Sequence, residues 1–201
     1  TGRDPFNGKL DELRVYADRA LTPTEVSSRM SNPITDDRGL VLSMTFDGSS
    51  ADLGKDSSCG GVGDATSMTG VVSVTGKECG AVDSSVGVIC KGCAAASGGA
   101  SFDGNTDGGS NIKSIITQDV DSIKDKSFSV GLYVQRKRVG KEEWLLTMGE
   151  RTTRGAVRML FRSTNKMGFD LWNDNTDTSS AFPDDTGVWV HWAFVYNKIG
   201  N

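Results

Sequence analysis

Residues 6–16 read FNGKLDELRVY. Side chains alternate between two faces along a β-strand. Strict alternation puts Leu10 and Tyr16 on one face of this segment and Leu13 and Val15 on the other. Because both faces carry apolar residues, the segment is predicted to be a strand that is covered on more than one side.

The chain then reads ALTPTEV, which has the features of a helix start. Thr22 suits the N-cap, Pro23 the first helical position and Glu25 the third. This is a T-x-x-E capping box, with proline at a position where its missing N–H costs nothing. The pattern predicts a short helix near residues 23–30, and Pro33 should stop it.

The remainder of the chain shows the period of two that is typical of strands. Leu40, Leu42, Met44 and Phe46 fall on one side of the clearest early example. Glycine, asparagine, aspartate or proline bounds each run, as is usual in sandwiches. The fold class predicted is therefore all-β, an antiparallel β-sandwich with one short helix. Further strands are predicted at residues 128–134, 144–148, 157–161, 167–172 and 187–196.

Composition excludes several classes of protein. The 201 residues are 36% hydrophobic and include 25 glycines, which suits a loop-rich globular chain. The net charge is −4 and no basic stripe carries interleaved aromatics, so nucleic acid is not an expected partner. No apolar run approaches the roughly 18 residues needed to cross a bilayer, so membrane insertion is not expected. The sequence lacks an initiator methionine and a signal peptide, and we expect it to be part of a longer protein.

The cysteines lie among loops rich in glycine and serine. An even number in this setting suits two disulfides and an oxidising compartment, and four cysteines allow three pairings. A zinc site is the alternative, because the last two cysteines form a CxxC. A second CxxC is missing and the only histidine, His191, is distant in sequence. The four residues are Cys59, Cys79, Cys90 and Cys93.

The opening segments resemble the closing segment of laminin-G-like (concanavalin A-like) domains, F-x-G-x-I-D-E-V-R-I-Y followed by A-L-S/T-x-x-E. Later segments resemble earlier parts of the same family: ASFDG at residues 100–104, the strand at 128–134, and GVWVHWAFVY at 187–196. The resemblance implies a jelly-roll sandwich. It also implies tandem units, since the end of the pattern comes before its beginning.

On this resemblance, residues 1–36 are the C-terminal strand and helix of one laminin-G-like unit plus a linker. Residues 37–201 are then the next unit, truncated at its C-terminal end. In the alternative arrangement, the leading strand folds onto the following unit and completes its sheet. A sandwich that lacks its closing strands would expose an unpaired edge, which invites pairing with a neighbour.

Catalysis is not expected. Glucan-cleaving enzymes with this sandwich carry two carboxylates on one strand face, one as nucleophile and one as acid. The pairs Asp11-Glu12 and Glu142-Glu143 instead alternate between faces. His191 has no obvious serine or cysteine partner and lies in an apolar strand, where a core or interface histidine is the simpler interpretation.

Calcium is the cofactor considered. Residues 103–108 read DGNTDG, the first half of a calcium loop in which alternate oxygen side chains surround a hard cation. Ser114 replaces the closing glutamate, so only a looser oxygen site at the rim is predicted. The alternative is that these residues are turn formers. The candidates from the loop are Asp103, Asn105 and Asp107, and the resemblance adds Asp11, Glu12 and Asp47.

Glycan binding needs an aromatic face beside amides or carboxylates. Trp172, Asn173, Asp174 and Asn175 offer that combination at a strand end. Tyr133 and Trp192 are expected to point outward from their strands. The alternative for each ring is packing inside the sandwich, where most tryptophans lie.

These features predict a non-catalytic recognition and adhesion module of an extracellular or cell-surface tandem-repeat protein. Its expected partners are glycans or extracellular proteins, and neighbouring copies or domains of the same protein. A structural subunit of an extracellular filament or matrix is the alternative. A glycan-cleaving enzyme is a second alternative, opposed by the missing carboxylate pair.

Overall fold

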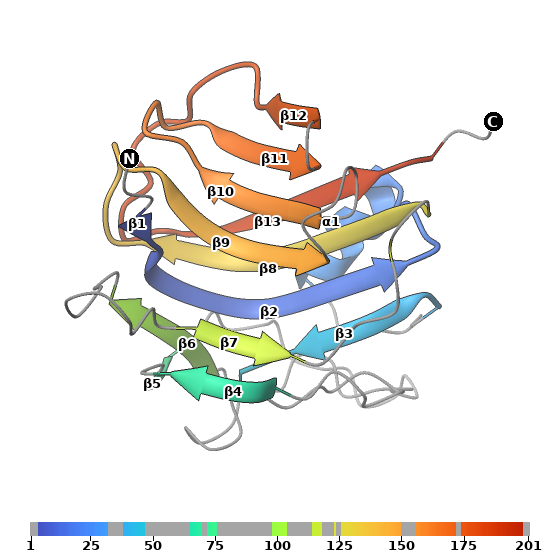
Figure 1. The fold of residues 1–201 in the computed structure, drawn as a ribbon, viewed down its shortest axis with the longest axis horizontal. Coiled ribbons are helices and arrows are strands. Elements are labelled where there is room, and N and C mark those ends of the chain that lie inside the picture. Colours follow the sequence, from blue (N-terminus) through green and yellow to red (C-terminus); the bar gives the residue numbers. More distant parts are fainter. Residues whose placement is uncertain are drawn as a thin grey trace.

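The structure is a computed structural model that describes residues 4–31, 38–46, 65–69, 72–75, 98–103, 114–117, 123, 126–149, 156–171 and 174–198. Within these residues the chain is an all-β sandwich with one short helix, as the alternation predicts. Two large sheets face each other across the core, and a separate two-stranded sheet lies beside them (Figure 1).

The first large sheet has five strands in the order β1 (Asp4–Pro5), β9 (Glu143–Gly149), β10 (Ala156–Phe161), β11 (Met167–Leu171) and β12 (Asp174–Asp177). The second has six strands: β13 (Trp189–Tyr196), β8 (Phe128–Arg136), β2 (Asn7–Ala17), β6 (Gly98–Asp103) and β5 (Val72–Thr75) in that order, with β3 (Leu40–Met44) also paired to β2. The small sheet pairs β4 (Ala65–Thr69) with β7 (Ser114–Thr117). All neighbouring strands described run antiparallel except β1 and β9.

Strand β2 lies inside the six-stranded sheet. It pairs with β8 along most of its length, while its other edge pairs first with β6 and then with β3 (Figure 1). Every residue from Leu10 to Ala17 is buried, so the prediction of a strand covered on both faces is confirmed. The leading segment and the residues after 37 therefore share one sheet, which is the alternative arrangement considered above.

The prediction of strict alternation along β2 is wrong at one point. Leu10, Leu13 and Val15 all contact the core, although an even spacing would separate Leu10 from the other two. The register with β8 shifts between Asp11 and Arg14, and Glu12 adopts a left-handed backbone with φ 52°. An extra residue in one strand changes which face the next side chains occupy. The bulge thus allows both halves of β2 to face the core.

Helix α1 (Pro23–Ser31) begins with the predicted capping box. The Glu25 backbone N–H donates to the Thr22 hydroxyl over 3.3 Å, and the Thr22 N–H donates to the Glu25 carboxylate over 2.8 Å. Hydrogen bonds to the Glu25 carboxylate, first from the Thr22 backbone N–H and then from the Thr22 hydroxyl and Arg19, lower the pKa of Glu25 to about 2. Within the described part of the chain, no helix has the length and apolarity to cross a membrane.

The core lies between the two large sheets. The inner face of β8 supplies Phe128, Val130, Leu132 and Val134, each no more than 2% exposed. Facing them are the side chains of β10 and β11, in agreement with the strands predicted at residues 157–161 and 167–172.

Close packing around Gly8 explains why the FNG motif has a glycine at this position. A Cβ atom at this position would meet the Gln135 carbonyl oxygen and the Phe6 ring, each at 2.4 Å. Gly131, on the neighbouring strand β8, is different, because the nearest atom to its Cβ would be His191 Nε2 at 3.4 Å, an ordinary contact.

Gly8→Ala is expected to lower the free energy of unfolding by about 1–3 kcal/mol, since the clash includes backbone that must move. Gly131→Ala is the matched control, and it should raise stability by about 0.5–1 kcal/mol because glycine inside a strand costs conformational entropy. Urea unfolding of both variants measures the difference. Equal effects of the two substitutions would contradict the packing described for Gly8.

Candidate functional site

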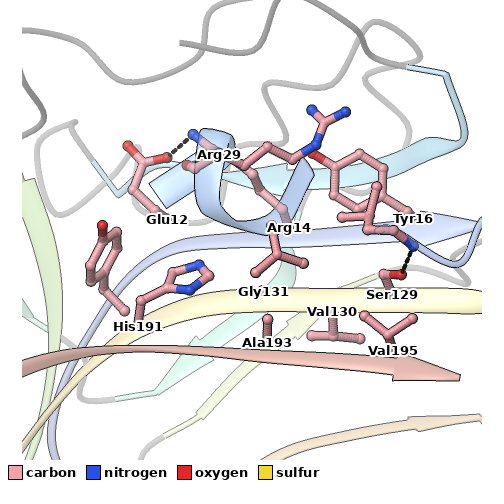
Figure 2. A pocket seen from close by; sticks show the side chains of 13 residues that line it. Glu12, Arg14, Tyr16, Arg29, Ser129, Val130, Gly131, His191, Ala193 and Val195 are labelled. Atoms are coloured by element: carbon pink, nitrogen blue, oxygen red, sulfur yellow. Dashed lines mark hydrogen bonds and ion pairs between the residues drawn. The ribbon is translucent and has the colours of Figure 1, made fainter. Parts of the chain in front are cut away.

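A hollow lies between helix α1 and the outer face of the six-stranded sheet, on the side of the sheet away from the core (Figure 2). It holds about 380 Å³ of empty space, part of it open to solvent. Strands β2, β8 and β13 form its floor, and the helix covers it. Its lining includes Glu12, Arg14, Tyr16, Leu21, Val26, Arg29, Ser129, Gly131, Tyr133, His191, Ala193 and Val195.

One row of the sheet carries the smallest side chains in the floor of the hollow. Ala193 of β13 is paired with Gly131 of β8, and Gly131 is paired with Arg14 of β2. Two neighbouring positions on the outer face therefore carry a methyl group and a hydrogen. Figure 2 shows this row between the labelled side chains on either side. We call the space above Ala193 and Gly131, which ends at Arg14, the trench.

Larger residues form the walls of the trench. One wall is His191 with its cross-strand partner Tyr133, whose rings meet edge to face with centroids 4.9 Å apart. On the other side, Val195 of β13 is paired with Ser129 of β8. The Ser129 hydroxyl donates to the Arg19 carbonyl over 3.0 Å and accepts the Leu21 N–H over 2.9 Å, which ties the start of the helical segment to the sheet.

The Glu12 carboxylate at the inner end of the trench is paired with Arg14. Arg14 Nη2 donates to Glu12 Oε2 over 2.5 Å, and both side chains are about 5% exposed. Arg14 Nη1 also donates to the Arg29 carbonyl over 3.1 Å, so the pair is bound to helix α1. Arg29 lies over the Tyr16 ring at 4.9 Å from its centroid. Burial raises the pKa of Tyr16 and of Tyr133.

His191 is uncharged near neutral pH. Burial first, and the positive charge of Arg14 second, lower its pKa to about 4. A neutral imidazole can donate one hydrogen bond and accept another. Of the described lining residues, only Ser129 offers a hydroxyl nucleophile of the usual kind, and it already bonds the backbone of residues 19 and 21. Within the described lining, no nucleophile is held against a base.

Among the strands that the structure describes, β13 lies at an edge of its sheet, and its composition does not suit that position. The sequence WVHWAFVY contains no charged residue at neutral pH. Its core-facing residues, Trp192 among them, are half-buried, whereas those of β8 are fully buried. On the outer side Val195 is 43% exposed, and Val188 just before the strand is 57% exposed.

The other free edges among the described strands of the two large sheets are short. Strand β1 has two residues, one of them proline, β12 reads DNTD and β5 has four residues. Strand β3, which pairs only with β2, has five residues, and residues 145–149 of β9 extend past β1. Short length, proline and charge are the usual means of preventing unwanted strand pairing. Strand β13, with eight residues, uses none of them.

The predicted calcium ligands do not meet in the described residues. Asp11 and Glu12 are buried in β2, and Glu12 pairs with Arg14. Asp103 lies opposite Asn7, four residues from Asp11 along β2, or about 13 Å at the rise of a strand. Asn105, Asp107 and Asp47 lie outside the described residues, within which no group of three or more His, Cys, Asp or Glu side chains could hold a metal.

The predicted glycan residues are described only in part. Asp174 begins β12, and Asn175 is exposed opposite Asp170 of β11. Trp172 and Asn173 lie outside the described residues, as do the four cysteines. Calcium, glycan binding and the disulfides therefore stay predictions of the sequence.

The prediction that the ring points outward from its strand is wrong for Trp192 and is confirmed for Tyr133, although Tyr133 is covered by other residues. Trp192 packs on the core, with Phe182 at 4.6 Å and Phe161 at 5.8 Å between ring centroids. Tyr133 does lie on the outer face, but it is only 8% exposed because His191 and the hollow's other residues surround it. Sequence reasoning missed the hollow, since two of the strands that helix α1 covers, β8 and β13, are far from it in sequence.

Comparison of the chain with protein-family models, with curated proteins and with solved structures found no match.

The lowered pKa of His191 predicts how the free energy of unfolding depends on pH. An unfolded chain binds a proton at His191 below about pH 6.5, whereas the folded chain resists it until about pH 4. The stability that His191 contributes is therefore fully present above pH 6.5 and is lost as the pH falls toward 4, by at most about 3 kcal/mol. Urea unfolding at pH 7 and pH 4.5 should show a larger loss for the wild type than for His191→Gln. Equal losses would contradict a buried neutral histidine.

Proposed function

We propose that this chain is a non-catalytic recognition and adhesion module of an extracellular, multi-unit protein. Its partner is an extended segment of another protein unit, which adds a strand to the free edge of β13. The resemblance to laminin-G-like domains supports the extracellular, tandem setting and a jelly-roll arrangement of the sandwich.

The proposal depends on one observation: β13 has the apolar composition of an interior strand but lies at an edge of the described sheet. An exposed edge presents backbone N–H and C=O groups that an incoming strand can pair with. Strands that are apolar on both faces normally lie in the interior of a sheet. The half-exposed aromatic face of β13 and the exposed Val195 on its other face would both be covered by one added strand.

Charge also defines the partner. Because β13 has no charged residue and His191 is neutral, nothing along the strand would compensate a charge on the incoming segment. The partner segment is therefore uncharged and apolar at alternate positions. This composition favours a protein strand over a glycan as the ligand of this edge.

A displayed library of ten-residue peptides, selected on the wild-type protein, tests the proposal. We expect selected peptides to have an alternating apolar pattern and no charge in their central residues. The double variant Val188→Lys/Val195→Lys places charge on the exposed side chains at β13, a natural form of edge protection, and should weaken binding at least about tenfold. Its stability should change by less than about 0.5 kcal/mol, as for other exposed positions.

Thr147→Lys/Asn175→Lys is the matched control, because it adds the same charge at exposed positions on β9 and β12. It should bind the peptides as the wild type does. Failure to select any peptide, or equal weakening by both double variants, would refute strand addition at β13. A glycan array with calcium and with chelator, probed in parallel, tests the glycan alternative, and binding there alone would favour it.

A further inference from the structure

The trench and the free edge are connected by the register of the sheet. A residue added opposite Ala193 on the outer edge of β13 would continue the row that runs through Gly131 to Arg14. Directly opposed residues on neighbouring strands hold their side chains on the same face, with Cβ atoms about 5 Å apart. The side chain of that added residue would therefore stand on the outer face, beside the opening of the trench.

Small residues along this row leave room for the incoming side chain. Ala193 is exposed and carries only a methyl group, and a Cβ at Gly131 would touch nothing closer than His191 Nε2 at 3.4 Å. A large side chain lying across Ala193 would enter the space above Gly131. A small one would leave that space without contacts, which forfeits the packing energy available there.

The residues in the walls of the trench determine which type of side chain it can accept. His191 and Tyr133 present aromatic rings on one side, and Val195 and Val26 present apolar groups on the other side and above. At the inner end the Glu12 and Arg14 charges are already paired with each other over 2.5 Å. A charged side chain would lose its hydration there, and a cationic one would also face the positive charges of Arg14 and Arg29.

We propose that the trench is the specificity pocket of the β13 edge, and that it takes one large apolar or aromatic side chain from the added strand. This inference rests on the proposed function, since it assumes that a strand pairs with β13. The pocket selects a single position of the partner segment, the residue opposite Ala193. The flanking residues on the same face lie opposite His191 and Val195, where larger side chains leave less room.

The test compares peptide selections on wild type, Gly131→Ala and Gly131→Leu. On the wild type, one position of the aligned peptides should carry Phe, Tyr, Leu or Met. Gly131→Leu fills the trench from below, and at that position it should select Ala, Ser or Gly instead, with the other alternating positions unchanged. Gly131→Ala should give an intermediate preference. Replacing the large side chain by alanine in one selected peptide should weaken its binding to the wild type at least tenfold.

A second measurement does not depend on the Gly131 variants folding. Nuclear Overhauser contacts between the peptide's large side chain and the Ala193 methyl group and His191 ring of the wild type would place it in the trench. The selected peptides could bind the wild type, fail to bind Val188→Lys/Val195→Lys, and yet show no preferred position and no such contacts. That result would overturn the inference and leave the proposed function standing.

Two other outcomes would overturn both proposals. One is a library that yields no peptide. The other is a wild-type protein that forms a stable dimer in sedimentation experiments and dissociates when Val188 and Val195 are replaced by lysine. In that case the occupant of the edge would be the β13 strand of a second copy rather than a segment of another kind.

Discussion

The structure depends on the burial of β2 on both faces and along both edges. It lies between β8 on one side and β6 and β3 on the other, and its residues from Leu10 to Ala17 are all buried. Removing it would separate β13 and β8 from the remaining strands of the six-stranded sheet. The constraint also explains Gly8, whose missing side chain lets Phe6 and the β8 backbone approach this strand.

The burial of β2 also determines how side chains and helix α1 are arranged on the outer face of the sheet. To keep Leu10, Leu13 and Val15 in the core, β2 takes up one extra residue, and Glu12 adopts a left-handed backbone that costs of order 1–3 kcal/mol. The paired Glu12 and Arg14 then hold helix α1 above the sheet. The trench is what remains between that helix and the two small residues of β8 and β13.

Much of the fold follows from local patterns, whereas the site does not. The T-x-x-E box marks the start of helix α1 correctly, and the period of two locates β8, β10, β11 and β13, because capping and alternation act over a few residues. The bulge at Glu12 was not predicted, since only the pairing with β8 requires it. The inward position of Trp192 and the trench likewise depend on register between distant strands, which single-strand patterns do not contain.

The central claim is that β13 is an open edge in a sheet whose interior strand is β2, and amide hydrogen exchange of the isolated chain tests it most directly. In an antiparallel edge strand, alternate N–H groups bond the neighbour while the others face outward. We expect the slowest exchange in β2, and in β13 an alternation between amides protected by β8 and amides that exchange nearly as fast as in an unstructured chain. Uniformly slow exchange from Trp189 to Tyr196 would mean that the edge is already covered, and would contradict the account.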